Sequence, residues 1–396
     1  MTYETLKGSH VKRNILIAVV IVFILSAIIL TFTKAKYRTT ESMPLLNGTI
    51  NYTLADLNIV EMYLNGEAID ALPDGNYELT EESYCTSEKN EKDESITLSY
   101  DGSTKAFTVT PFNKKGTKCY LYFEEGATAG DTILASENAP TSSTTDWTGG
   151  TTYYYTGKPN NWVQFAGFYW RIIRINGDGS IRMIYQGTGA NTTDIGTRIG
   201  TSAFNSSAGN KTYVGLVYDE INQHGYGTNS TIMNMLNNWY NNNLVSYEED
   251  YIDTGTGFCS DRNMASGYNF NSSGTIYFAP YNRTGNGSLQ CNVLDVLSQD
   301  NGKIPNSIGL LTSDEYVLGG SVNSYLDVDI NYWTMSPFYY GSRAFVFVVS
   351  SSGYLVNNDG VTWSSPGVRP VINIRANVSL TGEGTSTNPF KVVGAG

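Results

Sequence analysis

Hydrophobic positions follow different patterns along this chain, and each pattern predicts a different kind of element. Residues 15–32 are uncharged and almost wholly apolar. As a helix they would rise roughly 27 Å, close to the thickness of a bilayer core. Lys34 and Lys36 follow where a cleavage site would need small residues. We therefore expect an uncleaved transmembrane helix over residues 14–33, with a cleaved secretion signal as the alternative.

The charges on the two sides of this run do not decide its orientation. Lys7, Lys12 and Arg13 precede it and three basic residues follow it, so the positive-inside count is equal. The long acidic region downstream and its cysteines are typical of a translocated segment. We expect residues 1–13 to be cytoplasmic, the membrane to be crossed once, and the bulk of the chain to be extracellular.

Apolar side chains at every second position predict strands further along the chain. The alternation occurs at residues 96–100, 107–109 and 119–123. Three short strands of this kind are typical of a small sheet. We expect a β-sandwich-like stalk domain over residues 54–125.

Two longer patterns lie in the following region. Residues 162–173 and 181–185 predict the strands of a hairpin, because the Gly-rich turn 176–179 separates them. Apolar residues at helical spacing over 232–240 predict a capped helix. We expect its aromatic side chains in the core; a partner-binding face is the alternative.

Composition indicates the boundaries of this larger domain. Residues 126–155 are rich in Thr, Ser and Gly and predict a linker. The Gly- and Thr-rich residues 381–396 predict a flexible tail. The ligand-binding domain is then expected to span residues 156–380.

The four cysteines form two pairs along the chain. Cys85 and Cys119 lie in the expected stalk, where a disulfide would add about 4 kcal/mol in the chain-entropy model; two buried thiols are the alternative. Cys259 and Cys291 bracket a Tyr- and Asn-rich insertion, and we expect a second disulfide there. A metal site is the alternative, although no histidine lies nearby.

Overall charge narrows the classes of partner. The net charge is −12 and no basic stripe occurs, so we expect no nucleic-acid partner. His10 and His224 are the two histidines. They leave little material for histidine-based catalysis or a zinc site.

Acidic residues give two further candidates for chemistry. Asp327, Asp329 and Asn331 alternate like the first ligands of a calcium loop, but Tyr332 occupies the position of the turn glycine. We expect no metal and no cofactor; a calcium ion at this loop is the alternative. The sequence does not place the pair Asp314-Glu315 or the pair at 248–249 across a cleft. We therefore expect these carboxylates to be solvated, and we expect no enzyme activity.

The segment 332–374 has the composition of a binding surface. Tyr, Ser, Asn, Phe and Gly crowd between its two ends, with few charges. Aromatic rings provide contact area at low entropic cost, and small polar residues provide adaptable hydrogen bonds. The alternative is an ordinary solvent-exposed hairpin.

This segment and several motifs before it resemble a family of bacterial surface proteins with a C-type-lectin-like fold. Members of that family include variable targets of diversity-generating retroelements. The residues that carry the resemblance are Phe168 to Ile173, Asp178 to Arg182, Ile308 to Glu315, Trp333, Ser336, Pro337, Ala344, Val348, Gly353 and Gly367 to Val371. The resemblance covers roughly the last 230 residues and implies a C-type-lectin-like domain there. Together with the expected transmembrane helix and all-β stalk, it leads us to expect a mixed α+β fold.

Strand alternation predicts which side chains of the segment are exposed. Ala344, Val346 and Val348 share one face, which we expect against the core, whereas Phe345 and Phe347 share the opposite face with Arg343; packing of these rings under a loop is the alternative. The expected ligand-binding residues are Phe338, Tyr339, Tyr340, Ser342, Arg343, Phe345, Phe347, Tyr354, Asn357, Asn358, Asp359, Trp363 and Ser364.

Taken together, these patterns predict a membrane-anchored recognition protein at the cell surface. It would bind a protein or glycan ligand through a diversified aromatic, Ser- and Asn-rich surface. An envelope enzyme related to glycan hydrolases, a fixed adhesin and a structural envelope protein are the alternatives.

Overall fold

The computed structural model describes residues 58–73, 77–86, 89–101, 106–111, 117–356 and 360–395. Apart from short stretches, the chain divides into two compact units between residues 124 and 125. The expected cytoplasmic segment and transmembrane helix lie outside the described residues. Within the described ranges, every helix is too short or too polar to cross a bilayer.

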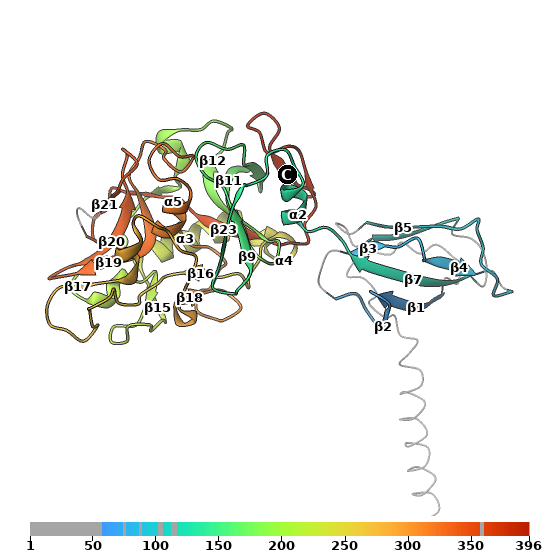
Figure 1. The fold of residues 1–396 in the computed structure, drawn as a ribbon, viewed down its shortest axis with the longest axis horizontal. Coiled ribbons are helices and arrows are strands. Elements are labelled where there is room, and N and C mark those ends of the chain that lie inside the picture. Colours follow the sequence, from blue (N-terminus) through green and yellow to red (C-terminus); the bar gives the residue numbers. More distant parts are fainter. Residues whose placement is uncertain are drawn as a thin grey trace, which may run out of the picture. The chain divides into compact units, whose positions relative to one another are not determined.

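Among the described residues, the first unit contains a five-stranded sheet and a separate pair of strands, β5 and β6 (Figure 1). Strand β1 runs parallel to β7, and β2 and β4 pair with these two in antiparallel fashion. Cys119, Leu121 and Phe123 are buried, whereas Tyr120 and Tyr122 face outward. The strands are β1 (Asn58–Leu64), β2 (Glu67–Ile69), β3 (Tyr77–Leu79), β4 (Tyr84–Thr86), β5 (Thr97–Asp101), β6 (Ala106–Thr110) and β7 (Lys118–Glu125).

A disulfide joins Cys85 of β4 to Cys119 of β7. The two residues are direct partners in the antiparallel ladder, and both side chains are buried. The prediction of a disulfide in this unit is confirmed.

The second unit contains two larger sheets around one hydrophobic core. In the first sheet the order is β23-β12-β11-β10-β25-β24, with β9 beside β11 and β8 beside β9. Its strands are β8 (Ser142–Thr145), β9 (Thr151–Tyr154), β10 (Trp162–Phe165), β11 (Phe168–Ile175), β12 (Ile181–Gly187), β23 (Val371–Ile374), β24 (Leu380–Thr381) and β25 (Phe390–Val392).

The second sheet carries the segment whose composition resembles a binding surface. Its order is β13-β22-β19-β20-β21, with β17 beside β19. Its strands are β13 (Gly200–Thr201), β17 (Ile276–Tyr277), β19 (Tyr332–Tyr340), β20 (Ala344–Val349), β21 (Leu355–Val356) and β22 (Gly367–Val368).

Short strand pairs and helices complete the second unit. Strand β14 pairs with β15, and β16 pairs with β18. The bounds are β14 (Val217–Tyr218), β15 (Thr228–Asn229), β16 (Phe258–Cys259), β18 (Val296–Leu297), α2 (Ala129–Leu134), α3 (Thr231–Asn243), α4 (Glu248–Tyr251) and α5 (Ser313–Leu318), together with the 3-10 turns η1 (Asp194–Thr197), η2 (Lys211–Val214), η3 (Val245–Tyr247), η4 (Ala279–Arg283) and η5 (Val293–Asp295).

The expected hairpin and the expected helix are both present. Strands β11 and β12 pair antiparallel around the turn before Ile181. In α3 the Ser230 side chain accepts a hydrogen bond from the backbone of Met233, which caps the helix. Trp239 packs edge-on against Trp170, so the aromatic side chains of α3 serve the core.

The mixed α+β class is wrong, because the structure is mostly β with few helices. Only α3 exceeds six residues among the described helices. Sustained helical spacing of apolar residues occurs there, whereas the other helices are single turns that connect strands. The rest of the unit is rich in Gly, Asn and Ser, which favour turns over long helices.

Two segments expected to be unstructured are part of the second unit. Residues 126–155 contain α2, β8 and β9, and β9 pairs with β11. In the expected tail, β25 adds to β10, and Phe390 is buried. Apolar residues widely separated in sequence complete the sheet here, a feature that local composition cannot reveal.

One carboxylate connects the two sheets in the interior of this unit. Glu315 of α5 accepts ion-paired contacts from Arg182 at 2.5 Å and from Arg174 at 3.6 Å, and all three side chains are buried. Ser313 of the same helix donates its backbone N–H to Ser336 of β19. Helix α5 therefore lies between β19 and the β11–β12 pair (Figure 1).

The expectation that Asp314 and Glu315 are solvated is wrong, since both are almost fully buried. Burial opposes ionisation of Glu315, but the charges of Arg182 and Arg174 outweigh it and lower its pKa. The carboxylate is therefore held in its ionised form.

Replacing Glu315 with glutamine tests this connection. Glu315→Gln keeps the side-chain shape but removes the ion-pair partner of the buried guanidinium groups of Arg174 and Arg182. We expect the free energy of unfolding to fall by about 3–5 kcal/mol, measured by urea denaturation. Glu249→Gln at an exposed position of α4 is the matched control, with a change within about 0.5 kcal/mol. Equal effects of the two substitutions would contradict the role of Glu315.

Candidate functional site

A cluster of seven aromatic rings covers one end of the second sheet. The rings come from the insertion between Cys259 and Cys291 and from strands β19 and β20. We call the cluster the aromatic array; its members are Tyr268, Tyr277, Tyr281, Phe338, Tyr339, Phe345 and Phe347.

The rings of the array form one continuous set of contacts. Tyr339 stacks on Phe345 with centroids 4.3 Å apart and planes within 8°. The ring of Tyr277 stacks on that of Tyr339, with centroids 5.5 Å apart. The centroid of Tyr281 lies 4.4 Å from that of Tyr277. Such pairs are worth about 0.5–1.5 kcal/mol beyond their buried area, so the rings hold one another in fixed positions.

Backbone pairing brings these rings together. Strand β17 pairs antiparallel with β19, which places Tyr277 opposite Tyr339. Strand β20 pairs with β19 and places Phe345 opposite Tyr339 on the other side. Three rings from three strands therefore lie in a row across the sheet.

The array has a buried base and an exposed edge. Phe347 is 3% exposed, whereas Tyr268 and Tyr281 are 39% and 41% exposed. Burial and the neighbouring tyrosines Tyr281, Tyr268 and Tyr339 raise the pKa of Tyr277. The hydroxyl of Tyr277 therefore stays protonated and can donate a hydrogen bond.

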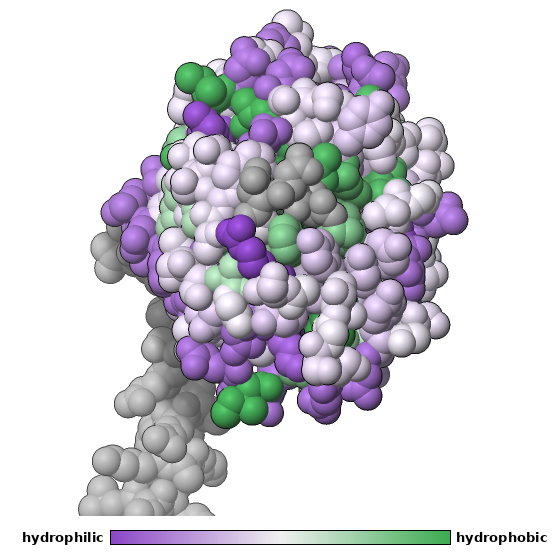
Figure 2. All heavy atoms as spheres, turned by 90° about the vertical axis from the view of Figure 1, so that its left-hand side faces the viewer, coloured by the Kyte–Doolittle hydropathy of each residue, from purple (hydrophilic) through white to green (hydrophobic). Residues whose placement is uncertain are grey.

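The face of the molecule that carries β19–β21 is mainly of intermediate hydropathy (Figure 2). Pale residues predominate there, with green and purple residues both near the middle of the view and around the rim. A surface of this kind suits a ligand with both polar and apolar groups.

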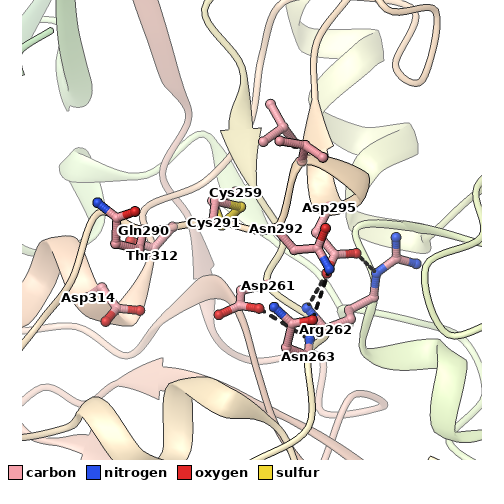
Figure 3. Close-up of a disulfide and its surroundings, with 12 residues drawn as sticks. Cys259, Asp261, Arg262, Asn263, Gln290, Cys291, Asn292, Asp295, Thr312 and Asp314 are labelled. Atoms are coloured by element: carbon pink, nitrogen blue, oxygen red, sulfur yellow. Dashed lines mark hydrogen bonds and ion pairs between the residues drawn. A yellow bond between two sulfur atoms is a disulfide. The ribbon is translucent and has the colours of Figure 1, made fainter. Parts of the chain in front are cut away.

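A disulfide and an arginine anchor the insertion that supplies three of the tyrosines. Cys259 and Cys291 form a disulfide, as expected from the sequence. Arg283 at the end of η4 makes a two-pronged contact with Asp314, at 2.8 Å and 3.0 Å, and a 2.7 Å contact with Asp261. Figure 3 shows Asp261 and Asp314 beside the disulfide.

The charges around Arg283 favour its ionised form. Burial lowers the pKa of Arg283, but its hydrogen bonds and ion pairs with Asp314 and Asp261 outweigh burial and raise it. A second buried pair lies beside the disulfide, where Arg262 donates to Asp295 at 2.9 Å (Figure 3). The insertion that carries Tyr277 and Tyr281 is thus held by covalent and ionic contacts.

The side chains of β20 that were expected to face the core do so. Ala344, Val346 and Val348 are buried, as predicted. Phe345 is half-buried, but Phe347 and Phe338 are not on the exposed surface. Their rings contact each other at 4.6 Å beneath the tyrosines, so for Phe347 the alternative of packing under neighbouring residues applies.

Three other expected residues, Tyr340, Ser342 and Arg343, follow Tyr339 along the chain. Tyr340 is half-buried and donates its hydroxyl to the carbonyl of Gly209 at 3.1 Å. Arg343 is exposed and donates to the hydroxyl of Thr362 at 3.0 Å. Ser342 lies beside Arg343 in the turn between β19 and β20 and is exposed.

Trp363 and Ser364 follow Thr362 in the loop before β22. Trp363 is half-buried, with its ring edge-on to Trp333 at 6.4 Å, and it packs against the core. Ser364 is exposed.

Tyr354 lies at the other end of β20. It is 61% exposed and its backbone N–H bonds to the side chain of Ser350, just after the last residue of that strand. The structure therefore does not bring Tyr354 together with Phe345. Asn357, Asn358 and Asp359 lie outside the described residues.

Tyr268, Tyr277 and Tyr281 were missed by the sequence reasoning. The available signal was the Tyr- and Asn-rich composition of the insertion between the cysteines. What the sequence did not reveal is the pairing of β17 with β19, because that pairing joins residues 276–277 to residues 339–340.

A pocket of about 390 Å³ brings three carboxylates together, from Asp146, Asp178 and Asp253. Each already accepts hydrogen bonds: Thr256 contacts both Asp178 and Asp253, and Thr152 contacts Asp146. Burial would raise the pKa of Asp146, but bonds from neighbouring threonines outweigh it and lower the pKa. This carboxylate is arranged to hold turns together and to stay ionised.

Metal ligands are not grouped in the part of the chain that the structure describes, where no set of three or more His, Cys, Asp or Glu side chains is placed to hold an ion. Comparison with family models, curated proteins and solved structures finds no match to this chain. The resemblance to lectin-like variable proteins is therefore carried by the sequence motifs alone.

Substituting Arg283 tests how the insertion is anchored. Arg283→Lys keeps the charge but cannot make the two-pronged contact with Asp314. We expect a loss of about 1–3 kcal/mol in the free energy of unfolding, measured by thermal or urea denaturation. Arg343→Lys, at an exposed arginine with a single hydroxyl partner, should change it by less than about 0.5 kcal/mol. If Arg283→Lys is as mild as its control, the anchor is assigned wrongly.

Proposed function

We propose that this protein is a recognition protein that acts outside the cell, at the cell surface, and binds a protein or glycan ligand through the aromatic array. The observation that carries the proposal is that the exposed Tyr268 and Tyr281 of the insertion and the half-buried Tyr339 of β19 converge in one cluster. Exposed rings gathered on one surface are a common sign of an interaction site.

The composition of the surface supports binding rather than catalysis. Tyrosine offers a large flat contact and a hydroxyl, and it loses little rotamer entropy when it binds. Tyr281 and Tyr268 supply exposed ring area, and the exposed Ser342 and Arg343 supply polar groups in the turn between β19 and β20. A surface of this kind can accept both the polar and the apolar groups of a ligand.

The support beneath the surface favours a preformed site. Phe338 and Phe347 form the buried base, and the Arg283–Asp314 contact and the disulfide restrain the insertion. A rigid site avoids the entropic cost of ordering loops on binding. Variation of the exposed side chains would then change the ligand without changing the fold.

Alanine substitution of one exposed and one half-buried tyrosine of the array tests the proposal. The full chain is screened on an oligosaccharide array and against a displayed peptide library, and the best ligand of either kind is used for titration. We expect Tyr281→Ala combined with Tyr339→Ala to weaken binding at least roughly ten-fold, because central aromatic residues contribute about 2 kcal/mol or more.

Tyr354→Ala is the matched control, since Tyr354 is more exposed but lies at the far end of β20. We expect it to change the affinity by less than about two-fold. Binding that resists the double substitution but is lost with Tyr354→Ala would place the site elsewhere.

Sequencing of this locus across one population tests the diversified character of the surface. We expect substitutions at exposed or half-exposed positions such as Tyr339, Arg343 and Phe345. Phe338 and Phe347 should remain large and apolar, because a buried Phe→Ala change costs about 3–5 kcal/mol. An invariant segment would favour a fixed adhesin.

A further inference from the structure

A second pocket in the larger unit shares no residue with the aromatic array. Its volume is about 340 Å³, within the range of small-molecule sites. Basic and aromatic side chains from the region around β10 and β11 form part of its wall, and a loop before β19 contributes two carboxylates. The residues that carry the argument are Lys158, Trp162, Arg171, Tyr325, Asp327 and Asp329.

Arg171 is a buried cation without an acidic partner. Its side chain is 7% exposed, and its guanidinium donates to the side-chain oxygen of Asn161 at 2.5 Å and to the carbonyl of Pro159 at 2.8 Å. Both acceptors are neutral. Among the described residues no carboxylate forms an ion pair with it, although buried charges are ordinarily paired.

The guanidinium of Arg171 is also fixed in place. It lies 4.2 Å from the centre of the Trp162 ring and 5.1 Å from that of Tyr325. Aromatic faces stabilise a cation but do not neutralise it. Burial lowers the pKa of Arg171 to about 10, so an anion in the pocket would offset an unfavourable desolvation.

A second unpaired guanidinium lies behind the pocket wall. Arg369 is 1% exposed and donates to the carbonyls of Leu326 and Tyr185 and to the side chain of Gln186. Gln186 lines the pocket, so the positive charge of Arg369 adds to that of Arg171 and Lys158.

The loop before β19 contributes the opposite charge. Asp327 accepts a 3.2 Å hydrogen bond from the backbone of Asn323, and its other carboxylate oxygen has no hydrogen-bond partner within the described structure. Asp329 is exposed. The pocket therefore presents uncompensated cations from one part of the chain and carboxylates from another.

We propose that this pocket binds a small zwitterion, namely a free amino acid or a dipeptide. Its carboxylate would contact Arg171 and Lys158, and its ammonium group would contact Asp327 and Asp329. A simple anion would bring a negative charge close to the two aspartates, and a simple cation would face Arg171. Only a ligand with both charges satisfies both sets of groups, because opposite charges stabilise and like charges destabilise at short range.

Calorimetric titration of the full chain tests the ligand class. The probes are L-alanine, L-serine and glycylglycine, compared with propionate, ethylamine and glucuronate at up to about 10 mM. We expect the three zwitterions to bind and the others to bind at least roughly ten-fold more weakly, since each lacks one charge-assisted contact. No binding of any zwitterion, or equal binding of propionate or glucuronate, would overturn the proposal.

Two exposed substitutions that leave the core intact separate the two ends of the ligand. Lys158→Gln and Asp329→Asn should each weaken L-alanine binding roughly ten-fold. The Asp329→Asn variant should bind L-alanine with an affinity close to its affinity for propionate. Lys391→Gln, at an exposed lysine of β25, should leave the affinity unchanged. Wild-type affinity in both pocket variants would refute this site. The aromatic array shares none of these residues, so the result of this titration does not depend on whether the array binds a ligand.

Discussion

The buried carboxylate of Glu315 is the contact on which the architecture of the larger unit depends. It compensates Arg174 of β11 and Arg182 of β12, while the same helix hydrogen-bonds to β19. Two guanidinium groups in the core would be strongly destabilising without it. The adjacent Asp314 holds Arg283, so the core and the support of the surface meet in one short helix.

This arrangement explains how a surface of small polar and aromatic residues is kept rigid. The tyrosines of the array lie over Phe338 and Phe347, and the insertion that carries three of them is restrained by a disulfide and by Arg283. A rigid base with an exposed edge separates folding from recognition. The pocket around Arg171 differs, because the buried guanidinium there has no acidic partner among the described residues.

Three predictions that rested on local patterns are confirmed. The cap and apolar spacing of α3, the β11–β12 hairpin and the alternation in β7 follow from residues a few positions apart. Several predictions about solvent exposure and unstructured segments were wrong. Glu315 and Phe347 are buried because partners distant in sequence cover them, and the segment 126–155 folds because β9 finds an edge of β11.

The sequence by itself determined the strand-rich character of the first unit, the pairing of its cysteines and the unusual composition of residues 332–374. Those properties follow from the spacing and the type of residues that are close to one another along the chain. Only the tertiary structure decided that Tyr277 lies beside Tyr339 and that Tyr354 lies apart from them. It also decided that Arg171 has no acidic partner among the described residues, because sheet pairing and burial join positions that no local pattern connects.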